Sequence, residues 1–205
     1  MNLWRGEKAL ILASQSRARR DVLSNAGLGF EAVPAEIDER SVELKSGLSA
    51  PGEVAGLLAE AKAQAVSGQH PGHYVVGADQ TLALGSRRFS KPADRDAAVA
   101  QLEALAGRTH ELHSAVAVVR DGRVLFTHVG VARMTMRPLN RAAIDAYLAS
   151  AGAAVLESVG CYQLEGLGVH LFERIEGDYF TILGLPLLPL LGFLRAEGVI
   201  DLKGS

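Results

Sequence analysis

A long pair of β-prone segments in the middle of the chain limits the folds available to it. Residues 109–120 and 124–136 are rich in apolar and β-branched side chains, and Asp121-Gly122 lies between them. An Asp-Gly pair between two such runs is a strong signal for a β-hairpin with a tight turn. The hairpin adds an antiparallel pair to a chain whose other strand-like segments alternate with helical ones. We therefore expect an α/β protein with a mixed sheet and flanking helices.

The remaining expected elements follow from apolar runs, helical spacing and turn residues. Strands are expected at 8–13, 30–34, 74–84 and 169–174, and helices at 17–26, 51–67, 94–105, 140–150 and 186–197. Pro51 suits the first turn of a helix, and Asn140 suits an N-cap. Residues 38–50 are polar and are expected to form a loop.

Composition limits the class of protein. The 205 residues suit one domain (1–205), built as one body or as two small lobes that share a core. A hydrophobic share of 48% with 21% charged residues is typical of globular proteins, and a net charge of −2 argues against a general nucleic-acid binder. The single cysteine, Cys161, excludes an intramolecular disulfide. We find no signal-peptide pattern and no membrane-length apolar run, so we expect a cytoplasmic protein with no membrane or nucleic-acid partner.

An apolar strand, a serine-rich loop and a basic helix start follow one another near the N-terminus. Ser14 and Ser16 offer hydroxyl and backbone N–H groups, and Arg19 and Arg20 lie in the first turn of the next helix. A helix N-terminus favours an anion, and guanidinium groups match phosphate oxygens. The alternative is a capped helix with a solvated basic turn. However, basic residues oppose the helix dipole there, and a bound polyphosphate would compensate them.

Asp79 follows an apolar strand and Gly77, which permits a close backbone approach. A carboxylate in such a place is costly unless it is hydrogen-bonded, paired or bound to a cation. It is therefore either satisfied by turn amides or acts as a general base or a ligand for a hard cation such as Mg²⁺ or Mn²⁺.

Other polar residues have a simple structural alternative to a functional role. The acidic segment 36–39 is solvent-facing or catalytic, and Lys62 and Lys91 are surface charges unless they face the same site. Glu165 lies in a glycine-rich segment and points either into a pocket or into a turn. The histidines lack metal-ligand spacing. Neither a P-loop nor a Rossmann fingerprint occurs, so phosphate must be bound in another way.

Nine short segments occur in an order and spacing that together are highly specific. They are Leu-Ala-Ser-x-Ser-x-x-Arg-Arg (12–20), Glu-Ile-Asp-Glu (36–39), Ala-Glu-Ala-Lys-Ala (59–63), Val-Gly-Ala-Asp (76–79), Lys-Pro (91–92), Leu-x-x-Leu-x-Gly-Arg-Thr-His (102–110), Glu-Gly-Leu-Gly (165–168), Glu-Arg-Ile-Glu-Gly-Asp-Tyr (173–179) and Gly-Leu-Pro-Leu (184–187). Through them the chain resembles the Maf family of nucleoside triphosphate pyrophosphatases, house-cleaning enzymes of nucleotide metabolism.

The resemblance implies a fold, a reaction and a set of site residues. The fold is a mixed α/β architecture with two lobes around a central cleft, like that of inosine triphosphate pyrophosphatases. Proteins of the family are commonly homodimers. The reaction hydrolyses the α–β phosphoanhydride of a nucleoside triphosphate to a monophosphate and pyrophosphate, with a divalent cation (Mg²⁺, Mn²⁺ or Co²⁺). By position, Asp79 matches the catalytic base and a metal ligand, Glu36 an acidic position near the metal, and Lys62 and Lys91 lysines of the site. The remaining matches form the phosphate-binding loop: Ser14, Ser16, Arg19 and Arg20.

Three positions sort substrates within the family. The dTTP/UTP type carries Arg, Thr and Gln, and the 7-methyl-GTP type carries Trp, Gln and Glu. This chain has Ala18, Gln80 and Glu165, so two of the three match the 7-methyl-GTP type. A carboxylate at Glu165 suits the N–H groups of a guanine edge. Ala18 departs from the pattern, because it removes the aromatic ring that would stack on a methylated base.

Rival hypotheses are a dTTP/UTP-type enzyme, an inosine triphosphate pyrophosphatase, and a non-catalytic nucleotide-binding regulator of cell division. A regulator would not need the catalytic acid or the lysines, yet Asp79, Lys62 and Lys91 are all present.

Overall fold

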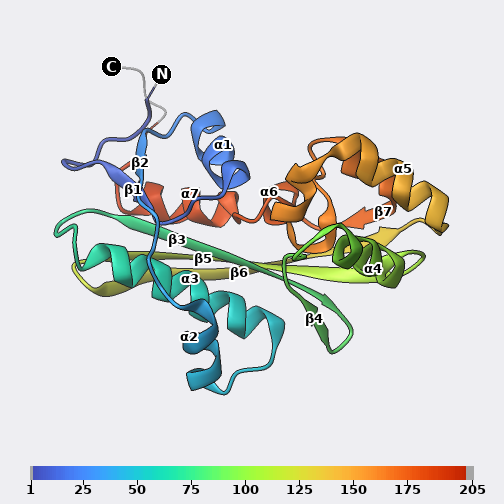
Figure 1. The fold of residues 1–205 in the computed structure, drawn as a ribbon. Helices are drawn as coiled ribbons and strands as arrows, with labels where there is room; N and C mark the ends of the chain where they lie inside the picture. Colours follow the sequence, from blue (N-terminus) through green and yellow to red (C-terminus); the bar gives the residue numbers. More distant parts are fainter. Residues whose placement is uncertain (1, 202–205) are drawn as a thin grey trace. The chain divides into compact units, whose positions relative to one another are not determined.

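The chain forms the mixed α/β architecture that the sequence predicts. The computed structural model describes residues 2–201 (Figure 1). The strands are β1 (Leu10–Leu12), β2 (Phe30–Ala32), β3 (Val75–Leu84), β4 (Arg87–Phe89), β5 (Thr109–Arg120), β6 (Arg123–Met136) and β7 (Phe172–Glu176). The α-helices are α1 (Arg17–Asn25), α2 (Glu39–Ser46), α3 (Pro51–Ser67), α4 (Arg95–Leu105), α5 (Arg141–Ala151), α6 (Tyr179–Ile182) and α7 (Leu187–Ala196). Short 3₁₀ helices cover Ala153–Glu157, Val159–Cys161 and Leu167–Leu171.

The sheet has seven strands, in the order β2-β1-β3-β5-β6-β7, with β4 paired to β3. Strand β1 runs parallel to both β2 and β3, whereas the β3/β4 and β6/β7 pairs are antiparallel. The predicted hairpin turn is confirmed: Asp121 and Gly122 both have positive φ angles, 51° and 73°. A two-residue turn of this kind matches the twist of the strands that it joins.

The chain forms two compact units. Among the described residues, the first comprises 2–80, 114–130 and 179–201, and the second comprises 81–113 and 131–178. The chain passes between the units inside β3, β5 and β6 and just before α6. That residues 1–205 act as one domain remains a prediction.

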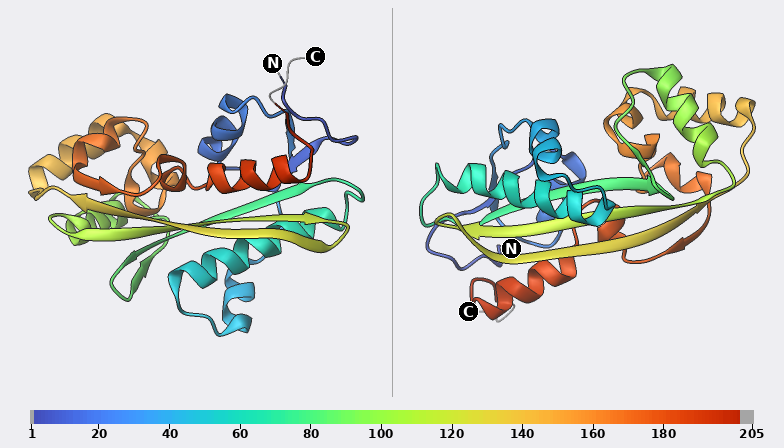
Figure 2. Two further views of the ribbon diagram at one scale, coloured as in Figure 1. Left: turned by 180° about the vertical axis from the view of Figure 1, so that it is seen from behind. Right: turned by 90° about the horizontal axis from the view of Figure 1, so that it is seen from below.

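In the first unit, helices cover both faces of the β1, β3 and β5 segments. Alternation along β1 directs Leu10 and Leu12 to one face, where they pack with residues of α1 and α7, and Ile11 to the other, where it packs against α3. Figures 1 and 2 show α3 and α7 on opposite faces of these strands in each view. The core of the first unit therefore has three layers, with buried strands in the middle.

Small residues bring α3 very close to the sheet. Ala55 and Ala59, one helical turn apart, pack on Ala115 and Ala117 of β5. On β3 the contact is closer still, since a Cβ atom at Gly77 would overlap the main-chain carbonyl oxygen of Ala59. The approach fixes the register between α3 and the start of β3.

The second unit has its own buried centre. His110 donates to or accepts from the Tyr162 hydroxyl at 2.7 Å, and the rings of Tyr162 and Phe172 meet edge to face. Burial lowers the pKa of His110 to about 4, so the ring is neutral at pH 7. Ion pairs of Arg141 with Glu103 and of Arg95 with Asp145 join α4 to α5 at the surface of this unit.

The structure corrects three expectations. Residues 38–50 are not a loop, because α2 lies there, with Asp38 accepting the Ser41 N–H at its N-cap and Gly47 ending it at a φ of 68°. The short strand β4 was not expected. The segment 169–174 is only partly a strand, since β7 begins at Phe172 after the 3₁₀ turn Leu167–Leu171.

Candidate active site

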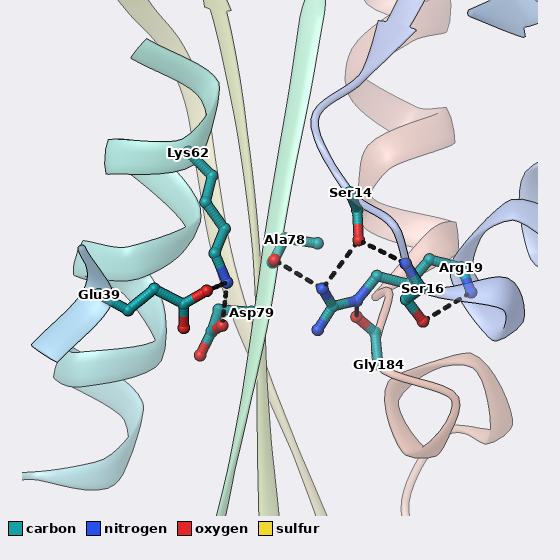
Figure 3. Close-up of polar contacts among 8 residues, drawn as sticks. All are labelled: Ser14, Ser16, Arg19, Glu39, Lys62, Ala78, Asp79 and Gly184. Carbon is teal, nitrogen blue, oxygen red and sulfur yellow. Dashed lines mark hydrogen bonds and ion pairs between the residues drawn. The ribbon is translucent and has the colours of Figure 1, made fainter. Parts of the chain in front are cut away.

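Two carboxylates meet one ammonium group on the α3 face of β3. Lys62 Nζ lies 2.6 Å from Asp79 Oδ1 and 2.9 Å from Glu39 Oε1 (Figure 3). The side chains of Lys62 and Asp79 are each 11% exposed, whereas that of Glu39 is 52% exposed. Lys62 lies on α3, and Glu39 lies in the first turn of α2. Because α3 packs closely on β3 at Gly77, Asp79, two residues further along β3, lies within reach of Lys62. The result is a half-buried cluster that is open on the Glu39 side.

Burial dominates the electrostatics of Asp79. Removal from water raises the pKa of Asp79 above its usual range, and the charges of Lys62 and Arg19 offset only part of that effect. A carboxylate with a raised pKa is a stronger base than one in water, which suits it to the role of a general base.

The serine loop lies on the opposite side of β3, as Figure 3 shows. Ser16 is the N-cap of α1, with its hydroxyl accepting the Arg19 N–H at 3.4 Å, and the Ser16 N–H donates to Ser14 Oγ at 3.2 Å. The first turn of α1 contains no acidic residue. Arg17 pairs with Asp21 at 3.6 Å, whereas Arg19, Arg20 and the dipole of α1 give the terminus beside the loop a positive potential.

The Arg19 side chain donates to a main-chain carbonyl of β3 that has no hydrogen bond from β1. Main-chain pairing of β1 with β3 ends where the Ala13 N–H donates to the Val76 carbonyl, at 2.8 Å. The next carbonyl on that side of β3, at Ala78, accepts from Arg19 Nη1 at 2.8 Å. The same nitrogen donates to Ser14 Oγ at 3.2 Å, and Nε donates to the Gly184 carbonyl at 2.8 Å. Burial lowers the pKa of Arg19, but from so high a starting value that the group stays charged.

Gln80 follows on the same face of β3 as Ala78, since side chains alternate along a strand. Its amide nitrogen lies 2.8 Å from Ser114 Oγ, 3.1 Å from the Thr181 carbonyl and 3.0 Å from the Ile182 carbonyl. The neighbouring phosphate-loop position, Ala18, is half-buried, and Arg20 is exposed. The structure thus brings together Ser14, Ser16, Arg19, Lys62, Asp79 and Gln80 within the first unit.

Lys91 and Glu165 belong to the second unit. Lys91 is exposed between β4 and α4, and Glu165 is exposed in the turn before the 3₁₀ segment Leu167–Leu171. Their roles in a site remain predictions.

The carboxylate that accompanies Asp79 is Glu39, which the sequence interpretation did not single out. Glu36 is exposed in the segment before α2. Among residues 2–201, no group of three or more His, Cys, Asp or Glu side chains is arranged to hold a metal ion. The signal that would have found Glu39 is Asp38 as an N-cap, because a helix that starts there places Glu39 in its first turn.

Comparison with known proteins identifies the family. The profile described as Maf-like protein matches residues 9–197. A protein of Rhodopseudomonas palustris named nucleoside triphosphate pyrophosphatase is 65% identical over 98% of this chain and 99% of its own length. One of Bradyrhizobium diazoefficiens with the same name is 64% identical over the same shares. One of Mesorhizobium japonicum named 7-methyl-GTP pyrophosphatase is 58% identical over 94% of this chain and 98% of its own length.

A mixed α/β fold with a half-buried aspartate–lysine pair on one side of β3 and an arginine-bearing serine loop on the other suits an enzyme that handles phosphate. The chain belongs to the Maf family. No helix within residues 2–201 has the length and apolar character needed to span a membrane.

Proposed function

We propose that the protein is a nucleoside triphosphate pyrophosphatase that cleaves the bond between the α- and β-phosphates. The observation that carries the proposal is the Asp79–Lys62–Glu39 cluster on one side of β3 with the Ser14–Arg19 loop on the other. The names of the relatives support it.

The residues of the first unit supply a base and an anion site. Asp79 orients a water molecule and accepts its proton, and Lys62 holds the carboxylate in place. Arg19 directs three N–H groups to protein acceptors, which leaves the Nη2 group of its guanidinium for a phosphate oxygen. The α1 N-terminus and the exposed Arg20 add positive potential for the rest of the triphosphate. In the second unit, Lys91 is proposed to neutralise a further phosphate charge.

A divalent cation, Mg²⁺, Mn²⁺ or Co²⁺, fits the acidic residues. Asp79 and Glu39 contact Lys62 Nζ through one oxygen each, Oδ1 and Oε1, which leaves the other oxygen of each carboxylate for a cation. Mg²⁺ is usually held by one or two carboxylates together with substrate phosphates. We propose that Asp79 and Glu39 hold the cation, with Glu39 in the place expected for Glu36. When bound, it supplies charge neutralisation on the phosphate oxygens.

For the base, we propose a modified purine such as 7-methyl-GTP. Support comes from Glu165, whose carboxylate suits the N–H edge of guanine, and from the name of the Mesorhizobium relative. The dTTP/UTP reading is the alternative that the assay below separates.

We also propose a cytoplasmic homodimer. The outer edge of β6 supports the dimer: β7 pairs with β6 only at Arg133–Met136, so in the part of the chain that the structure describes the earlier edge has no partner strand. The sequence Val-Leu-Phe-Thr-His-Val-Gly-Val-Ala (124–132) on this edge contains no charged residue or proline. Natural sheets normally protect such edges, so an uncharged apolar edge favours pairing with a second copy.

Pyrophosphate release tests the activity. The panel contains UTP, dTTP, CTP, GTP, ITP, 7-methyl-GTP and pseudo-UTP, each with Mg²⁺, Mn²⁺ or Co²⁺. We expect 7-methyl-GTP to lead, and Asp79→Asn to lower kcat by about 10²–10⁴-fold, the usual contribution of a general base. Asp96→Asn, an exposed aspartate in the first turn of α4, is the matched control and should keep wild-type turnover.

The outcomes separate the parts of the proposal. A lead for UTP or dTTP would retain the enzyme and reject the purine assignment. Wild-type turnover in Asp79→Asn would reject the base. No release from any nucleotide would reject the activity and favour a binding regulator.

A further inference from the structure

Gln80 occupies a position at which the family sorts its substrates, but its surroundings indicate another role. Thr181 and Ile182 present main-chain carbonyl oxygens to it, and these can only accept hydrogen bonds. The atom that faces them must therefore be the NH₂ group. Both of its N–H groups are directed to acceptors within the protein, so the nitrogen is not available to donate to a nucleobase.

A continuous chain of hydrogen bonds leads from this amide to Arg19. The Thr181 carbonyl that Gln80 binds also accepts the Gly184 N–H, at 3.1 Å. The Gly184 carbonyl in turn accepts from Arg19 Nε at 2.8 Å. Gly184 has a φ of +88°, and a Cβ atom there would lie 3.3 Å from Arg19 Nε and 3.8 Å from Gln80 Cδ. The 181–184 segment is thus enclosed between the two side chains.

The chain of bonds closes into a ring. Arg19 Nη1 returns to the Ala78 carbonyl on β3, two residues before Gln80. Ser114 strengthens the ring, since its hydroxyl accepts from Gln80 and donates to the Thr181 carbonyl at 2.6 Å. At Gly130 the packing is closer than at Gly184, because a Cβ atom would lie 2.6 Å from Thr181 Oγ1. Strands β3, β5 and β6 all contribute to holding this one segment.

The structure assigns Gln80 a positioning role: through the 181–184 segment it fixes the guanidinium of Arg19 against Ser14, and so shapes the polyphosphate site independently of the base. This inference rests on the proposed function, in which Arg19 binds phosphate. Loss of the amide N–H groups removes the Gln80 bonds to the Thr181 and Ile182 carbonyls and leaves Ser114 to hold the Thr181 carbonyl. The 181–184 segment is then held less firmly, so the Gly184 carbonyl fixes the Nε edge of Arg19 less firmly as well.

Inorganic tripolyphosphate separates this role from recognition of the base, because it has no base. We compare its Kd by calorimetry for the wild-type protein, Gln80→Glu and Gln80→Met. Loss of hydrogen bonds worth about 0.5–1.5 kcal/mol predicts a Kd raised about 2- to 12-fold. Gln80→Glu is nearly isosteric but cannot donate a hydrogen bond, so it should raise the Kd for tripolyphosphate at least as much as Gln80→Met does. Gln64→Met, an exposed α3 glutamine bonded only to Glu60 in the described contacts, should leave the Kd unchanged.

Two further measurements keep the inference falsifiable. Ser114→Ala removes the hydroxyl that supports the ring and retains Gln80. It should also raise the Kd for tripolyphosphate, by a smaller factor than Gln80→Met. Arg19→Lys combined with Gln80→Met should be non-additive, since both changes act on one guanidinium. All variants are compared well below their melting temperatures, with unchanged circular dichroism required.

The outcomes distinguish the inference from the function that it deepens. If the wild-type protein neither binds tripolyphosphate nor hydrolyses nucleotides, the proposed function fails. If the wild-type protein does both, yet Gln80→Met and Gln80→Glu bind tripolyphosphate as tightly as it does and lose only discrimination among bases, the positioning role is overturned.

Discussion

At the scale of single residues, Asp79 carries the largest electrostatic cost of the proposed site. It is buried, and its pKa is raised because removal from water outweighs the attraction of Lys62 and Arg19. In the unfolded chain an aspartate titrates near its ordinary value, about 3.9. The folded protein therefore holds the Asp79 proton to a higher pH than the unfolded chain does, and ionisation of Asp79 opposes folding.

This linkage predicts the sign of a pH dependence. The free energy of unfolding of the wild-type protein, relative to that of Asp79→Asn, should fall as the pH rises from below about 3.9 through the raised pKa of the folded state, and should then stay level. Urea titrations between pH 3.5 and 8 with EDTA present measure it, since a cation would favour the carboxylate. A difference that instead rises with pH would mean that the charges of Lys62 and Arg19 lower the pKa of Asp79 by more than burial raises it.

For Arg19, the sequence predicts the position of the side chain but not its hydrogen-bond partners. Its place in the first turn of α1 correctly indicated a positive terminus next to the serine loop. Its hydrogen bonds to main-chain carbonyls could not be predicted, because the acceptors lie at Ala78 and Gly184, far along the chain. Long-range hydrogen bonds to main-chain carbonyls leave no residue-type signature.

At the scale of elements, the contact between α3 and β3 sets the distance between Lys62 and Asp79. We predict opposite effects for two glycine-to-alanine changes. Gly77→Ala should destabilise the protein by about 1–3 kcal/mol, the usual cost of overpacking, because the new methyl group meets the backbone of α3. Gly56→Ala, inside α3 and with only Val129 at an ordinary 3.8 Å, should stabilise it by about 0.5–1 kcal/mol through helix propensity.

Denaturant unfolding measures both glycine variants, and activity distinguishes packing from positioning. Gly77→Ala should also lower turnover, since α3 must shift away from β3 and carry Lys62 with it, whereas Gly56→Ala should retain turnover. Equal stability of the two variants would contradict the close contact between the helix and the strand.

The elements that sequence reasoning found are those with strong local signals. Pro51 and Asn140 marked helix starts, and Asp121-Gly122 marked the hairpin, and all three are confirmed. Helix α2 was missed because it buries no residue and so has no apolar stripe, although Asp38 caps it. Glu36 follows from the resemblance to the family, whereas the contact of Glu39 with Lys62 depends on the start of α2, which the polar sequence of this segment did not indicate.

At the scale of the whole molecule, the first unit holds the proposed base, its lysine and the serine loop, and the unpaired edge of β6 begins in the same unit. Along this edge Leu125 and Val129 are each 39% exposed. An edge strand pairs with a copy of itself about a two-fold axis, which closes the assembly at two subunits and removes both edges from solvent.

We therefore predict that the protein, of 21.7 kDa per chain, has twice that mass by light scattering and that Val129→Lys reduces it to one chain. A lysine on the edge strand keeps its charge in water as a monomer but would be enclosed in the paired sheet. Leu188→Lys is the control: Leu188 is more exposed, at 58%, but lies on α7, so the dimer should persist. A dimer that survives Val129→Lys and is lost with Leu188→Lys would place the interface on α7. A wild-type mass of one chain would reject the homodimer and leave the uncharged β6 edge for a partner strand from another protein.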